Sequence, residues 1–154
     1  MEMKSTPDTT VWRHWKKVKI AVCALGGVQS AAVPPSELLS IRWVDAAIMV
    51  VVAPLVVVLV AGLQSANPAS ERQWRRPTWN ANPFNLGQPL SFFHLAGWFF
   101  FAGGLGLTIP AIRTGPQLLA APLLLLCVGI GTLTGVRLCE MVFRWKFTRS
   151  GASA

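Results

Sequence analysis

The sequence is poor in charge, above all in acidic side chains. Asp and Glu number 6 against 14 Lys and Arg, only 13% of the 154 residues are charged, and 53% are hydrophobic. This is about half the charged fraction of an average soluble domain, which excludes an ordinary water-soluble globule. In a soluble protein, the net charge of +8 would indicate nucleic acid binding. Here the basic residues flank apolar blocks, so we expect contact with anionic lipid headgroups and none with nucleic acid.

Cysteine and histidine are scarce too, and tyrosine is absent while tryptophan occurs 7 times. No CxxC pair is present, and an odd number of cysteines cannot pair fully within one chain, which argues against a thiol oxidoreductase. Only His14 and His94 could join the cysteines, and no such set has the spacing of a zinc site. We therefore expect no metal, no resident cofactor and buried unpaired thiols at Cys23, Cys127 and Cys139.

Three apolar runs are long enough to cross a hydrocarbon layer of about 30 Å as helices. They cover residues 43–63, 90–112 and 117–142. The first run is rich in valine, which in water would favour a strand. In lipid only a helix or a closed barrel satisfies every backbone group, and one run cannot form a barrel, so we expect a helix. Pro54 near its centre predicts a kink.

A weaker apolar stretch, residues 18–33, follows a basic segment and resembles a signal peptide in outline. Glycines and polar residues dilute it, so we expect an uncleaved short span, with an interfacial or re-entrant segment as the alternative. If it crosses, all Lys and Arg except Arg42 and Arg113 lie on one side. If it does not, they divide equally, which the positive-inside rule disfavours.

The sequence thus predicts an all-α polytopic membrane protein, a bundle of four transmembrane helices of which the first is weak. We expect a single membrane domain, 1–154, in the inner membrane of a cell, with both termini in the cytoplasm. An organelle membrane is the alternative. The segments of the domain are a basic N-terminus (1–17), spans at 18–33, 43–63, 90–112 and 117–142, a cytoplasmic loop (64–89) and a basic tail (143–154). The short outer connections leave no room for a receptor-like domain.

Glycines mark places where two helices can approach closely. Gly103 and Gly104 lie in the part of the second strong run that follows its phenylalanines, and Gly131 and Gly135 form a GxxxG spacing in the last run. Small residues allow backbone contact between membrane helices. The GxxxG face therefore serves either packing within the bundle or a dimer contact.

The loop 64–89 concentrates aromatic and basic side chains, more than a disordered linker normally has. They are Arg72, Trp74, Arg75, Arg76, Trp79 and Phe84. One interpretation is an interfacial loop whose rings lie at headgroup level and whose arginines meet anionic lipids. Another is a docking surface for a protein partner, because Trp and Arg commonly anchor interfaces. The two are compatible.

Ionisable groups near the membrane interior are candidates for function. His94 falls about one helical turn inside the third span, and Cys139, Glu140 and Met141 lie at similar depth near the end of the last. His94 with Met141 or a cysteine could hold haem or a metal, and His94 with Glu140 could relay protons. Alternatively, water, a carbonyl or a headgroup satisfies the imidazole. Glu140 is spaced to pair with Arg137 and Arg144.

These features favour a protein that acts by protein or lipid interaction: an accessory subunit, an assembly factor or a partner-binding protein. We expect it to bind a protein partner or to form a homo-oligomer. The alternative is a cofactor-binding, redox or proton-relay subunit that uses His94. A small transporter is the second alternative, although Asp45 and Glu140 lie near span ends and no repeat is evident. No catalytic constellation points to an enzyme.

Overall fold

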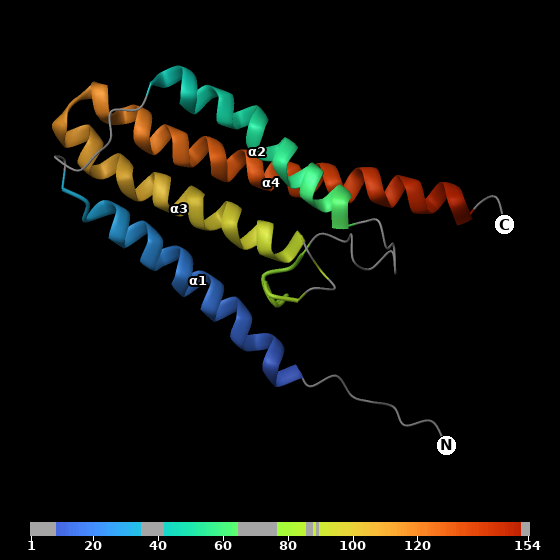
Figure 1. Ribbon diagram of the computed structural model, residues 1–154. Helices are drawn as coiled ribbons and strands as arrows, with labels where there is room; N and C mark the ends of the chain where they lie inside the picture. The colour runs from blue at the N-terminus through green and yellow to red at the C-terminus, as the bar shows by residue number, and fades with distance from the viewer. Residues whose placement is uncertain (1–8, 35–41, 65–76, 86–87, 89, 152–154) are drawn as a thin grey trace.

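The computed structural model describes residues 9–34, 42–64, 77–85, 88 and 90–151. Four α-helices account for most of this part: α1 (Thr9–Ala31), α2 (Trp43–Gln64), α3 (Leu90–Thr114) and α4 (Ala120–Gly151), with a short 3-10 helix, η3 (Pro116–Leu119), before α4. The described residues include no strand. The predicted all-α class with four helices is therefore confirmed (Figure 1).

Three helices are long and apolar enough to cross a membrane. Their apolar stretches are Trp43–Leu63 in α2, Leu90–Thr114 in α3 and Ala120–Phe143 in α4, close to the runs predicted from the sequence. Helix α4 begins later than the predicted 117 because η3 takes up the chain after Gly115, whose φ of 136° favours glycine. It also continues beyond 142, so the basic tail is helical as far as Gly151. Helix α1 is not among the three, and its crossing stays a prediction.

The helices form an open layer in the order α1, α3, α4, α2 rather than a closed ring. Helix α3 packs between α1 and α4, and α2 packs on the far side of α4. In Figure 1, α1 and α3 run in one direction and α2 and α4 in the other. The starts of α1 and α3 and the ends of α2 and α4 consequently lie at the same end of the layer, here called the loop end.

Close backbone approach at glycine defines the contacts of α3. A Cβ atom at Gly106 would overlap the carbonyl oxygen of Gly27 in α1. On the other side of α3, a Cβ atom at Gly97 would lie 2.8 Å from Leu133, and one at Gly104 would lie 2.8 Å from Leu126. Apolar lipid tails give helices no hydrophobic reason to associate, so tight packing of this kind is the main source of contact energy.

The GxxxG glycines of α4 face α2. A Cβ atom at Gly131 would lie 3.0 Å from Ala53, and one at Gly135 would lie 2.8 Å from Val57 and 2.9 Å from Cα of Pro54. These two glycines thus lie at a contact within the chain. The contact at Gly103 is less tight, because a Cβ atom there would lie 3.4 Å from Oγ of Ser30 in α1.

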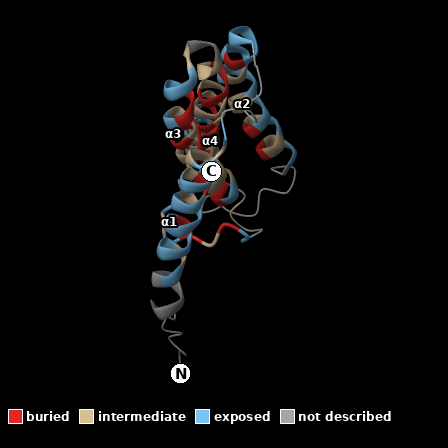
Figure 2. Cartoon of the chain, turned by 90° about the vertical axis from the view of Figure 1, so that its left-hand side faces the viewer, coloured by how far each residue is buried: buried red, intermediate tan, exposed pale blue. Residues whose placement is uncertain are grey.

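Within the helices, buried residues lie mainly on the inner faces of the layer, as Figure 2 shows. The main cluster of buried side chains joins α2, α3 and α4 near the loop end, and consists of Val57, Ala61, Leu90, Val136 and Cys139. The outward face of α2 is apolar and exposed, with Leu59 at 64% and Leu63 at 76%. Such a face suits a lipid environment, because lipid tails are as apolar as the side chains.

Candidate functional site

Residues 77–85, here called the turn segment, fold against the loop end of α1 and α3. The Ala81 N–H donates to the Thr78 carbonyl (3.0 Å), and the Phe84 N–H donates to Asn82 Oδ1 (2.9 Å). Pro77, Ala81 and Pro83 are buried. Asn and Pro favour such turns because the amide side chain bonds to nearby backbone and proline presets φ. The turn segment is therefore a folded element.

Lys19 and Trp15 attach the turn segment to α1. The Lys19 side chain is fully buried, and its Nζ donates to the Thr78 carbonyl at 3.2 Å. One turn earlier on α1, the ring of Trp15 meets that of Phe84 edge to face, with centroids 6.3 Å apart. A buried ammonium needs such an acceptor, because burying an unpaired charge is costly.

Trp79 attaches the same segment to α3 through a cluster of rings. The centroid of Trp79 lies 5.6 Å from that of His94 and 5.5 Å from that of Trp98. Trp98 in turn lies 5.8 Å from Phe101. Aromatic pairs at these separations stabilise by about 0.5–1.5 kcal/mol each beyond their buried area. We call Trp79, His94, Trp98 and Phe101 the ring cluster.

His94 is held within this cluster. It is 4% exposed, and its Nε2 accepts a hydrogen bond from Trp98 Nε1 at 3.3 Å. An imidazole nitrogen that accepts an N–H carries no proton, so neutral His94 has its proton on Nδ1. The bond engages the nitrogen that most often ligates a metal.

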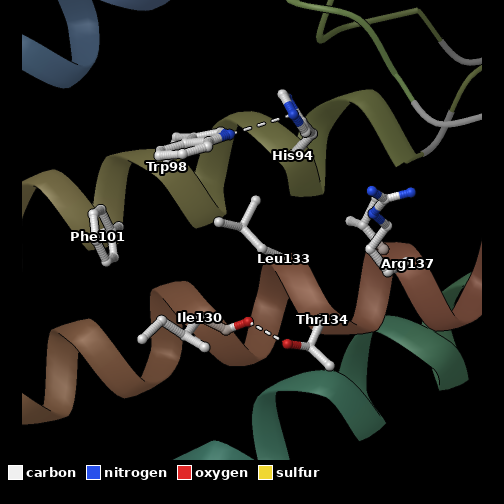
Figure 3. A pocket seen from close by; sticks show the side chains of 8 residues that line it. His94, Trp98, Phe101, Ile130, Leu133, Thr134 and Arg137 are labelled. Atoms are coloured by element: carbon white, nitrogen blue, oxygen red, sulfur yellow. Dashed lines mark hydrogen bonds between the residues drawn. The ribbon is translucent and has the colours of Figure 1, made fainter.

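A pocket of about 260 Å³ lies between α3 and α4 beside the ring cluster. We call it the α3–α4 pocket; it is lined by His94, Trp98, Phe101, Ile130, Leu133, Thr134, Val136 and Arg137. In Figure 3, Leu133 and Arg137 extend from α4 toward α3, where the Trp98 indole points to His94. The Thr134 hydroxyl donates to the carbonyl of Ile130 (2.9 Å), so its hydrogen is already bonded and it adds little polarity to the pocket.

The partners considered for a cofactor at His94 do not line the α3–α4 pocket with it. Met141 is 59% exposed and does not line the α3–α4 pocket. Cys139 is 1% exposed within the apolar cluster of α2, α3 and α4. Over the described residues, no three His, Cys, Asp or Glu side chains converge as a metal site.

Glu140 pairs with Arg137, as the spacing predicted. Arg137 Nη1 lies 3.2 Å from Glu140 Oε2, and the side chain of Arg144 lies outside the described residues. Asp45 lies in the first turn of α2, where the positive end of the helix dipole favours a carboxylate.

The predicted contact residues of the loop divide into two groups. Trp79 points inward to the ring cluster, whereas Phe84 remains 70% exposed. Arg72, Trp74, Arg75 and Arg76 lie outside the described residues. The loop thus uses one aromatic side chain as an anchor and presents another to its surroundings.

Sequence reasoning missed Lys19, Trp98 and Arg137 as parts of this site. Trp98 follows His94 by one helical turn, a spacing that places both side chains on one face and could have indicated the pair. Lys19 gave no such signal, because its acceptor lies 59 residues away. Arg137 was expected only as the partner of Glu140.

Together, the three apolar helices, the glycine contacts and the anchored turn segment define a polytopic α-helical membrane protein. No family model matches the chain, and comparisons with curated proteins and with solved structures give no match. Any function must accordingly be argued from the site itself.

Proposed function

We propose that this protein acts by binding a partner protein through the loop end, at the surface formed by the turn segment and the first turns of α1. The observation that carries the proposal is the contrast within the turn segment. Lys19 and Trp79 fix it to α1 and α3, yet it presents Phe84 with 70% of its surface exposed. A large ring on a rigid support is a typical interface anchor, because binding then costs little ordering entropy.

The charge around Phe84 suggests the nature of the partner. Lys16 and Lys17 follow Trp15, the residue that contacts Phe84, and both are exposed. Excess positive charge selects partners with acidic surfaces and speeds their association. The partner would therefore present an acidic segment close to the membrane.

In the orientation that we propose, the protein lies in the inner membrane of the cell and its loop end faces the cytoplasm. Helix α1 lies parallel to α3, since Gly26 is near Phe99 and Gly27 is near Ala102 and Gly106. This direction supports a fourth crossing, which would gather all Lys and Arg except Arg42 and Arg113 at the loop end. The positive-inside rule then assigns that end to the cytoplasm.

The test is a photo-crosslinking side chain in place of Phe84 in native membranes. The matched control is the same substitution at Ile112, which is 67% exposed near the other end of α3. We expect Phe84 to give a discrete protein adduct that Ile112 does not give. Adducts with lipid alone, or identical bands from both positions, would overturn the proposal.

A further inference from the structure

The α3–α4 pocket changes in polarity along its length. Gly97 opposes Leu133 and Gly104 opposes Leu126, so α3 and α4 are antiparallel and their residues can be ordered by depth. By this register, His94 and Arg137 lie nearest the loop end, and Phe101 and Ile130 lie deepest. One end of the pocket therefore carries the guanidinium of Arg137, which is ion-paired with Glu140, and the other end is apolar, along the direction in which the helices would cross a membrane.

We propose that the α3–α4 pocket binds one acidic phospholipid, with its phosphate at Arg137 and an acyl chain against Phe101, Ile130 and Leu133. A lipid in a leaflet has the same order of charge and hydrocarbon. The pocket volume of about 260 Å³ suits the part of the lipid next to its headgroup. The rest of the lipid lies along the exposed apolar surface, to which Ile130 belongs at 50% exposure.

Arg137 has the chemistry that a phosphate requires. It lies inside the apolar stretch Ala120–Phe143, where a charged residue usually marks a functional contact. Its ion pair uses Nη1, and a guanidinium has further N–H donors in the fork geometry that matches a phosphate. The side chain is 55% exposed, so a headgroup can reach it.

The neighbouring side chains shape the Arg137 end of the pocket. Glu140 holds Arg137 from the following turn of α4, and its own side chain is only 17% exposed. The hydrogen bond from Trp98 fixes the His94 ring at the wall of the pocket. Beside the apolar end the backbones of α3 and α4 pack closely, because a Cβ atom at Gly129 would lie 2.7 Å from the Phe101 nitrogen.

The experiment measures lipid retained by the full chain, purified in mild detergent, by native mass spectrometry. Phosphatidylglycerol is compared with phosphatidylcholine of the same acyl chains, and inorganic phosphate is added as a competitor. We expect phosphatidylglycerol to be retained at about one molecule per chain. Arg137→Gln should lower its affinity by about tenfold, since a charge-assisted bidentate contact is lost. Lys17→Gln removes the same charge from an exposed position and should change it less than about twofold.

A second variant keeps the charge and fills the apolar end. Ile130→Trp should lower retention of phosphatidylglycerol while leaving Arg137 and Glu140 in place. Its exposed position makes it tolerant of a larger side chain, so it remains informative if Arg137→Gln fails to fold.

Three results would overturn the inference: equal losses for Arg137→Gln and Lys17→Gln, equal retention of phosphatidylcholine, or displacement of the lipid by inorganic phosphate, which would make the ligand a free anion. None of them bears on the crosslink from Phe84, because that side chain is not part of the α3–α4 pocket. The two proposals are therefore tested independently of each other.

Discussion

Lys19 shows how one side chain can hold an irregular segment in place. Its Nζ and the Ala81 N–H both donate to the Thr78 carbonyl, so the lysine completes a turn that is already closed by the backbone. Thr78 itself is exposed, so the bond joins a surface residue of the turn segment to α1 and does not join one helix to another. The bond accordingly contributes to local order more than to the stability of the helices.

Lys19→Met keeps the length of the side chain and removes the donor. We expect the amides of residues 77–85 to exchange with deuterium about fivefold faster, the effect of losing about 1 kcal/mol of local stabilisation. Hydrogen exchange followed by mass spectrometry in detergent measures this rate. Lys17→Met, at an exposed position of the same helix, is the control, and an equal acceleration in both variants would contradict the role given to Lys19.

At the scale of elements, each pair of packed helices meets at glycine. Gly27 and Gly106 join α1 to α3, and Gly97 and Gly129 join α3 to α4. Gly131 and Gly135 join α4 to α2. Dispersion contacts and weak Cα–H···O bonds are the interactions that such proximity strengthens. Because each helix approaches its neighbour through small residues, bulky side chains elsewhere on the helix remain free to face lipid.

Gly106→Ala should therefore weaken the attachment of α1 to α3. The new methyl would meet backbone atoms of Gly27, which cannot rotate away, and overpacking of this kind costs about 1–3 kcal/mol. Gly62→Ala is the matched control, since nothing lies within 4 Å of its added Cβ. Both changes gain the same helix propensity, about 1 kcal/mol, so their difference isolates the packing.

Reversible unfolding in mixed micelles with increasing sodium dodecyl sulfate gives the two free energies of unfolding. We expect the Gly106→Ala variant to be less stable than the Gly62→Ala variant. Equal stabilities would show that the close approach of α1 and α3 contributes nothing measurable.

At the scale of the whole molecule, alternating helix directions place the starts of α1 and α3 and the ends of α2 and α4 at the same end of the layer (Figure 1). The turn segment then spans the two parallel helices, bonded to Lys19 on α1 and packed against Trp98 on α3. The same alternation places Thr114 at the opposite end. From this arrangement we expect α1 to be a fourth passage across the membrane rather than an arm lying on its surface.

Single cysteines at His14, Asn80 and Thr114, in a chain whose native cysteines are replaced by alanine, test that arrangement. A maleimide that cannot cross the membrane should label the His14→Cys and Asn80→Cys variants from the same side. It should label the Thr114→Cys variant from the other side. Labelling of His14→Cys together with Thr114→Cys would mean that α1 does not cross.

Much of the fold followed from patterns along the chain. The apolar runs predicted three long helices because lipid requires internally satisfied backbone of about 20 residues, and the Arg137–Glu140 pair followed from helical spacing. The continuation of α4 to Gly151 was missed, since a polar segment gives no apolar signal. The site was harder to predict. His94 was singled out from the sequence, but its packing against Trp79 depends on a contact between a loop and a helix, which no local pattern shows.

The amino-acid sequence by itself determined that this is a membrane protein of helices, because hydropathy and length act locally and need no knowledge of neighbours. Only the tertiary structure decided which helices are neighbours: α3 at the centre, α1 and α4 beside it, and α2 outermost. The physical reason is that glycine contacts form wherever two backbones fit closely, and that fit depends on both helices at once. The same is true of the buried Lys19 and of the pocket that Arg137 lines together with His94, Trp98 and Phe101.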